Sequence, residues 1–123
     1  FVTQRHILQK RYDSLLNDLA IIKPYQDQDN YSALHLYPIQ VDLESIDKSR
    51  QQIFDELRQS GIGVNVHYIP IHTQPYYQQL GFQEGSFPNS EVYYDRAISI
   101  PLFHTMTLEQ QDEVVNNLKS ILI

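Results

Sequence analysis

Apolar residues recur at the spacing of an amphipathic helix near both ends of the chain. Residues 2–19 carry the first of these stripes, and Thr3 stands where a capping side chain would begin the helix. Thr107 and Gln110 form the signature of a capping box in front of the second stripe. The inward positions of that stripe are Val114, Val115, Leu118, Ile121 and Leu122. The pattern therefore predicts a helix at each end of the chain.

Three segments between these helices indicate strands, at residues 31–41, 64–69 and 97–100, and the second of them is short and β-branched. Pro38 cannot donate a hydrogen bond to a ladder, so we expect the first strand to lie at an edge or to carry a bulge. None of the strands is followed by a glycine-rich loop that could cradle phosphates. Dinucleotide-binding and P-loop folds are therefore excluded.

Shorter helices are expected between the strands. Ser45 or Asp47 should begin the first of them, and Gly61 is a natural stop for it. Its inward residues are Ile46, Ile53, Phe54 and Leu57. One helical turn is expected at residues 76–80, and a helix over 88–96 opens on a proline. This order of elements predicts an α+β fold, with a small, mainly antiparallel sheet covered by helices.

Composition narrows the class of protein. The chain has 123 residues with 41% hydrophobic and 20% charged residues, which is ordinary for a soluble globular protein. A net charge of −6 without a basic cluster disfavours nucleic-acid binding. No apolar run approaches the ~20 residues that span a bilayer, so we expect no membrane partner and a cytoplasmic location. The absence of cysteine excludes disulfides and thiolate metal sites. Because Phe1 opens the chain inside a predicted helix, we expect a longer parent protein.

Residues 61–77, GIGVNVHYIPIHTQPYY, concentrate the candidate chemistry. Imidazole and phenol groups on a proline-stiffened loop suit the wall of a polar-ligand site. The plainer alternative is that His67 and His72 are hydrogen-bonded loop residues. No carboxylate lies close to them in sequence, and fully extended they would lie about 16 Å apart, so no metal site is expected.

Catalytic residues are harder to find. Two Ser-His-acid sets can be drawn, but neither has a nucleophile elbow, and no cysteine is available as a nucleophile. The two sets are His67 with Asp95 and Ser99, and His72 with Glu84 and Ser86. The lysines all stand where a solvated lysine is usual, rather than in an apolar context that would suit imine chemistry; they are Lys10, Lys23, Lys48 and Lys119. We therefore expect no catalytic residue in this chain.

Two blocks carry a family resemblance, GIGVNVHYIPIHTQPYYQQLGF and FPNSEVYYDRAISIPLFHTMTLEQQDEVVNNL. They closely resemble the C-terminal part of the DegT/DnrJ/StrS sugar aminotransferases. The sequence of these blocks is most similar to the branch of the family that aminates a UDP-linked keto sugar on the route to pseudaminic acid. The resemblance covers residues 49–122. It implies that residues 1–20 are the interdomain connecting helix and that residues 21–123 are the C-terminal small domain.

The resemblance implies a homodimeric, pyridoxal-phosphate-dependent enzyme of the aspartate-aminotransferase fold. In such enzymes a lysine of the large N-terminal domain holds the cofactor. An amino donor, usually glutamate, supplies the amino group that passes to the nucleotide-linked keto sugar. By this interpretation the chain alone is inactive and holds no cofactor. The alternative is a non-catalytic ligand-binding or regulatory module on the same scaffold.

The family pattern HxQxY falls on His72, Gln74 and Tyr76. In relatives this loop lies at the mouth of the active site, near the nucleotide sugar. The resemblance therefore implies that His72 and Tyr76 bind substrate through diphosphate or sugar oxygens, with His67 and Tyr68 as second choices. No residue is expected to be catalytic, to bind the cofactor or to hold a metal.

Overall fold

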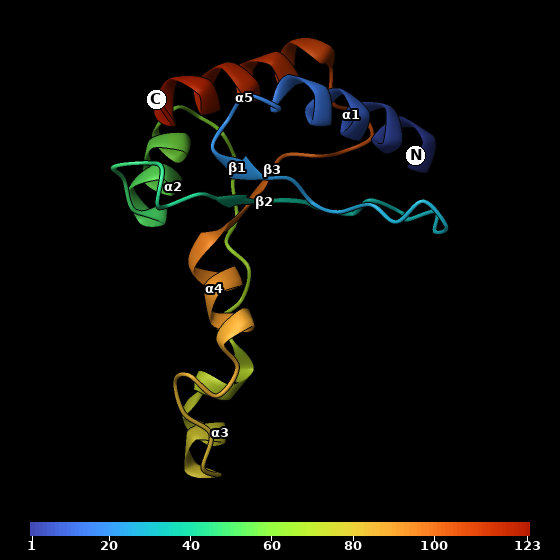
Figure 1. The fold of residues 1–123 in the computed structure, drawn as a ribbon. Coiled ribbons are helices and arrows are strands. Elements are labelled where there is room, and N and C mark those ends of the chain that lie inside the picture. Colours follow the sequence, from blue (N-terminus) through green and yellow to red (C-terminus); the bar gives the residue numbers. More distant parts are fainter.

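The computed structural model describes all of residues 1–123. Figure 1 shows two long helices above a small sheet, with a narrow limb extending below it. The elements are α1 (Val2–Leu15), β1 (Ile21–Ile22), β2 (Tyr37–Val41), α2 (Arg50–Gln59), the 3-10 turn η1 (Ile71–Thr73), α3 (Pro75–Gln79), α4 (Pro88–Arg96), β3 (Ala97–Ile100) and α5 (Leu108–Ile121). The predicted α+β class is confirmed.

The sheet is antiparallel, in the order β1-β2-β3. Strand β2 is central, which would normally exclude a proline such as Pro38. However, β1 pairs only with Gln40 and Val41, so Pro38 has a neighbouring strand on one side only, where it faces Ser99. The edge position expected for Pro38 therefore holds locally, although the strand as a whole is not an edge strand.

The structure differs from the prediction at two of the expected strands. The strand expected over 31–41 begins only at Tyr37, because residues 31–36 extend beyond the sheet and have no strand beside them. The strand expected over 64–69 is absent, and a single bridge joins Asn65 to Ser99. After that bridge the chain leaves the sheet, so its β-branched residues have no ladder to join.

The boundaries of two helices also differ from the prediction. Helix α1 begins at Val2 without a side-chain cap, so Thr3 is not the capping residue. It ends at Leu15 rather than near residue 19, because the chain then turns to form β1, a strand that the sequence did not predict. Helix α2 is capped by Ser49 through a complete capping box, and not by either residue proposed upstream. The predicted capping box of α5 is confirmed.

The hydrophobic core lies between the sheet and the helices. It contains 20 buried residues, with α1 and α5 side by side over the sheet and α2 packed against α5 (Figure 1). Tyr12 of α1 and Tyr37 of β2 are fully buried, with ring centroids 5.0 Å apart. Their hydroxyls donate to the Pro101 carbonyl (2.9 Å) and to Asp13 Oδ1 (2.5 Å). Burial raises the pKa of both phenols, so both remain neutral donors.

Residues 70–96 form the narrow limb, which we call the arm (Figure 1). It consists of η1, α3 and α4, and it projects away from the sheet. Between residues 71 and 96 only His72 is buried, while aromatic side chains lie exposed along the limb. The arm therefore has almost no hydrophobic core, and polar contacts must help to hold its shape. No helix of the structure has both the length and the apolar character needed to cross a membrane.

Candidate functional site in the arm

His72 is the centre of the arm. It lies in η1, whose turn is stabilised by the hydroxyl of Thr73 donating to the Pro70 carbonyl at 2.8 Å. The imidazole is 6% exposed, and its Nε2 lies 3.0 Å from Oε1 of Glu91 on α4. The ring of Phe87 packs edge-on against it, with centroids 5.0 Å apart. The 3-10 turn thus directs His72 into the arm, against α4.

Glu91 joins three segments of the arm. Its carboxylate accepts from Nε2 of His72 and from the backbone N–H of Gly85, at 2.8 Å for Oε1 and 3.1 Å for Oε2. These hydrogen bonds, first the one from His72 and then the one from Gly85, hold the pKa of Glu91 below its usual range. Gly85 has a φ of +86°, a backbone conformation that favours glycine. The carboxylate therefore ties η1, the 81–87 loop and α4 together.

We expect acid to weaken the hydrogen bonds that the Glu91 carboxylate accepts from His72 and Gly85. The pKa of Glu91 is lowered in the folded state, so its stabilising contribution is present above the ordinary glutamate range and is lost as the pH falls through the lowered value. In ¹H–¹⁵N NMR spectra the amide of Gly85 should then titrate with a midpoint below that range. Glu91→Gln should abolish this titration, and Glu84→Gln should preserve it. A Gly85 signal that does not respond to acid would contradict the prediction.

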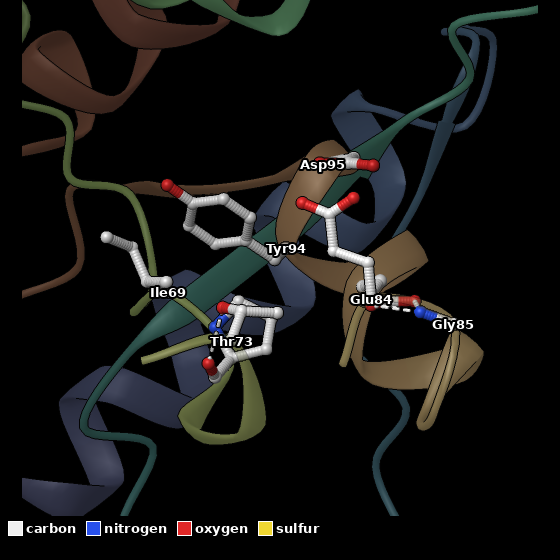
Figure 2. Close-up of a pocket in the computed structure, with 8 residues that line it drawn as sticks. Ile69, Thr73, Glu84, Gly85, Tyr94 and Asp95 are labelled. Atoms are coloured by element: carbon white, nitrogen blue, oxygen red, sulfur yellow. Dashed lines mark hydrogen bonds between the residues drawn. The ribbon is translucent and has the colours of Figure 1, made fainter. Parts of the chain in front are cut away.

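Two hollows flank the pair of His72 and Glu91. The hollow on the Glu91 side has a volume of about 630 Å³, and Figure 2 shows Thr73 of η1 and Tyr94 and Asp95 of α4 around it. Its full lining is Ile69, Pro70, Thr73, Glu84, Gly85, Glu91, Tyr94 and Asp95. Three carboxylates make it unfavourable for a diphosphate. The hollow on the His72 side measures about 380 Å³ and is mainly aromatic; its lining is Ile71, His72, Tyr77, Phe82, Phe87 and Ser90.

The other predicted site residues occupy different surroundings. His67 is half-buried, and its Nε2 is hydrogen-bonded to Oγ of Ser99, a residue of β3 that is 4% exposed. Tyr68 is 88% exposed and meets the edge of His67, with ring centroids 6.0 Å apart. Tyr76 opens α3 after Pro75, and it is 66% exposed with a hydroxyl that bonds no protein group. His67 and His72 have no common partner.

The Ser-His-acid sets drawn from the sequence are not assembled as triads. His67 does meet Ser99, but that serine is buried in β3, where it could not attack a substrate, and Asp95 makes no hydrogen bond to the pair. His72 pairs with Glu91 and not with Glu84 or Ser86. No group of three or more histidine and carboxylate side chains is arranged to hold a metal ion.

Sequence reasoning missed Glu91. The one local signal was an acidic residue in the first turn of a helix that begins with Pro88, which is favourable for the helix dipole whatever lies nearby. Its partner His72 lies 19 positions earlier in the sequence, and no periodicity connects the two.

The small antiparallel sheet, its covering helices and the aromatic arm define the class of protein. The fold is the small domain of the aspartate-aminotransferase-like fold found in sugar aminotransferases. The structure of a putative sugar aminotransferase, Spr1654 from Streptococcus pneumoniae, superimposes on 98% of this chain with a TM-score of 0.86 and 28% identity. PseC from Helicobacter pylori, an aminotransferase of pseudaminic acid biosynthesis, covers 98% with a TM-score of 0.86 and 25% identity.

Sequence comparison identifies the family. Residues 1–119 match the DegT/DnrJ/EryC1/StrS aminotransferase family, and the chain belongs to it. The spore coat polysaccharide biosynthesis protein SpsC of Bacillus subtilis is 35% identical over 121 residues, which are 96% of this chain. The chain spans 31% of the length of SpsC and of Spr1654, and 32% of that of PseC. The family predicted from the two sequence blocks is confirmed.

Proposed function

We propose that this chain is the C-terminal small domain of a homodimeric, pyridoxal-phosphate-dependent aminotransferase. The whole protein would transfer an amino group from an amino acid, glutamate, to a nucleotide-linked keto sugar. The observation that carries the proposal is the superposition on Spr1654, which is described in both a PLP form and a PMP form. These are the two forms of the cofactor between which an amino group is carried.

The cofactor would be held outside this chain. Lys23 donates to the Asp13 carbonyl (2.8 Å), and Lys48 donates to Glu56 (2.7 Å) and the Ile121 carbonyl (3.0 Å). The other two lysines of the chain, Lys10 and Lys119, lie exposed on helices. No lysine lines either hollow of the arm, which supports the proposal that the cofactor is held elsewhere in the whole protein. In the proposal the catalytic lysine belongs to the large domain, and the chain alone is inactive.

The contribution of this chain would be the substrate side of the active site. In the proposal the exposed phenols of Tyr76 and Tyr68 offer hydrogen bonds to the nucleotide sugar, and His72 and His67 complete that wall. Residues 1–20 would connect the two domains, although α1 also packs in the core of residues 21–123 through Leu8, Tyr12 and Leu16. In the proposal the whole protein acts in polysaccharide biosynthesis, as the name of SpsC suggests for that relative. We also place it in the cytoplasm.

The proposal is tested with the whole protein loaded with pyridoxal phosphate. Glutamate should remove the visible absorbance band of the bound cofactor, and a UDP-linked keto sugar should restore it. If glutamate removes the band but no keto sugar restores it, the proposal that the amino acceptor is a nucleotide-linked keto sugar is wrong. A band that survives every amino donor would favour the alternative, a non-catalytic ligand-binding or regulatory module. The isolated 123-residue chain serves as the negative control and should show no band.

A further inference from the structure

The partners of His72 decide which ring nitrogen carries its proton. Nε2 lies 3.0 Å from a Glu91 oxygen, and the same carboxylate accepts the N–H of Gly85. The pKa of Glu91 is lowered by these donors, so its side chain is ionised near neutral pH. An ionised carboxylate can only accept hydrogen bonds. Nε2 of His72 must therefore be the donor, and in the neutral imidazole Nδ1 carries a lone pair.

Nδ1 is the nitrogen left for a ligand. No protein group bonds to it, since the one hydrogen bond of the ring is made by Nε2. Among the buried side-chain nitrogen and oxygen atoms, Arg5 Nε alone lacks a hydrogen-bond partner, so Nδ1 of His72 is not completely buried even though the residue is 6% exposed. His72 lines the hollow that Tyr77, Phe82 and Phe87 also line. Nδ1 is therefore the one polar atom of the ring that no protein group engages, in a residue that lines a mainly aromatic hollow.

We propose that Glu91 is a positioning residue that fixes the Nε2–H tautomer of His72, so that Nδ1 accepts a hydrogen bond from a hydroxyl or amino group of the sugar. This inference rests on the proposed function. It changes the role that the family resemblance implies for His72, in which the ring donates to diphosphate or sugar oxygens. A phosphate oxygen has no proton to give to Nδ1, whereas a sugar hydroxyl does.

The tautomer can be observed directly. The 123-residue chain, labelled with ¹⁵N-histidine, is studied by long-range ¹H–¹⁵N correlation about two pH units above the ordinary histidine pKa, where imidazoles are neutral. His72, assigned by loss of its signals in His72→Gln, should show a protonated Nε2 and a bare Nδ1. Glu91→Gln should convert this to a mixture of tautomers, and Glu84→Gln should leave it unchanged. A protonated Nδ1 in the wild-type chain would overturn the proposal even if the Glu91 variant failed to fold.

Kinetics of the whole protein test the ligand chemistry. Glu91→Gln should raise the KM for a UDP-linked keto sugar about tenfold, the effect of one weakened hydrogen bond, while the Kd for UDP alone stays unchanged. An equal loss of affinity for UDP would place His72 on the diphosphate and overturn the inference. If no amino donor removes the cofactor band in the wild-type protein, the proposed function fails, and the NMR result still decides whether Glu91 sets the tautomer.

Discussion

Replacement of Tyr37 by alanine should lower the free energy of unfolding of the chain by about 3–5 kcal/mol, the usual cost of removing a buried aromatic ring. Tyr37 is fully buried where β2 meets α1, and its ring lies 5.0 Å from that of Tyr12. Its hydroxyl also donates to the carboxylate of Asp13 at 2.5 Å. Alanine would therefore leave a cavity between helix and sheet and remove a partner of a carboxylate. Urea denaturation followed by circular dichroism measures the change.

Two control variants separate the contributions. Tyr37→Phe retains the ring and removes only the hydroxyl, so it should cost about 1.5–3 kcal/mol, the range for a hydrogen bond to a charged group. Tyr25→Ala removes the same side chain from a position that is 87% exposed, and it should change stability by less than about 0.5 kcal/mol. If Tyr37→Ala were no more harmful than Tyr25→Ala, the contact between α1 and β2 would not contribute to the core as described.

Local signals predicted those parts of the fold whose structure is determined locally. Thr107 and Gln110 cap α5 as predicted, because the capping box needs only residues that lie within one turn. Gly61, with a φ of +81°, follows the end of α2 for the same reason. The burial of Gln111 was not predicted, because a polar residue on a helix is usually exposed to solvent. It is fully buried, and its amide donates to the Leu8 carbonyl at 2.7 Å across the interface of the two long helices.

Strands were predicted less well, because a strand needs a partner that the local sequence does not show. Residues 64–69 have the composition of a strand, but after the bridge from Asn65 to Ser99 the chain departs toward the arm. Ile21 and Ile22 form β1 only because Gln40 and Val41 lie beside them. The same limitation applies to the candidate site.

The candidate site could be located from the sequence but not assembled from it. The family pattern marked His72 and Tyr76 as residues of interest, and the structure places both on the arm. From the sequence, Glu84 could be drawn with His72, but no spacing showed which acidic residue the fold would bring to the imidazole. The fold selects Glu91, because α4 folds back beside η1 and turns that carboxylate toward the imidazole. The chemistry of the site therefore depends on a tertiary contact.

In the whole protein, His72→Ala should raise the KM for the nucleotide sugar by about 5–150-fold, the range for one buried hydrogen-bonding group and its unpaired partner. The half-reaction with glutamate should change by less than about twofold, because a contact that binds only the nucleotide sugar plays no part in the reaction with glutamate. Stopped-flow absorbance of the bound cofactor separates the two half-reactions. His35→Ala, at an exposed histidine outside the arm, is the matched control and should alter neither.

A second substitution distinguishes a ligand contact from support of the arm. In His72→Gln the side-chain N–H of glutamine can still donate to Glu91, so the arm should retain its shape and the Gly85 amide its hydrogen bond. Glutamine does not place an acceptor where Nδ1 stood, so the KM should remain raised while the Gly85 amide signal stays near its wild-type position. If His72→Gln instead restores the KM fully, His72 serves only to hold Glu91. If both variants slow the two half-reactions equally, His72 has no selective contact with the nucleotide sugar.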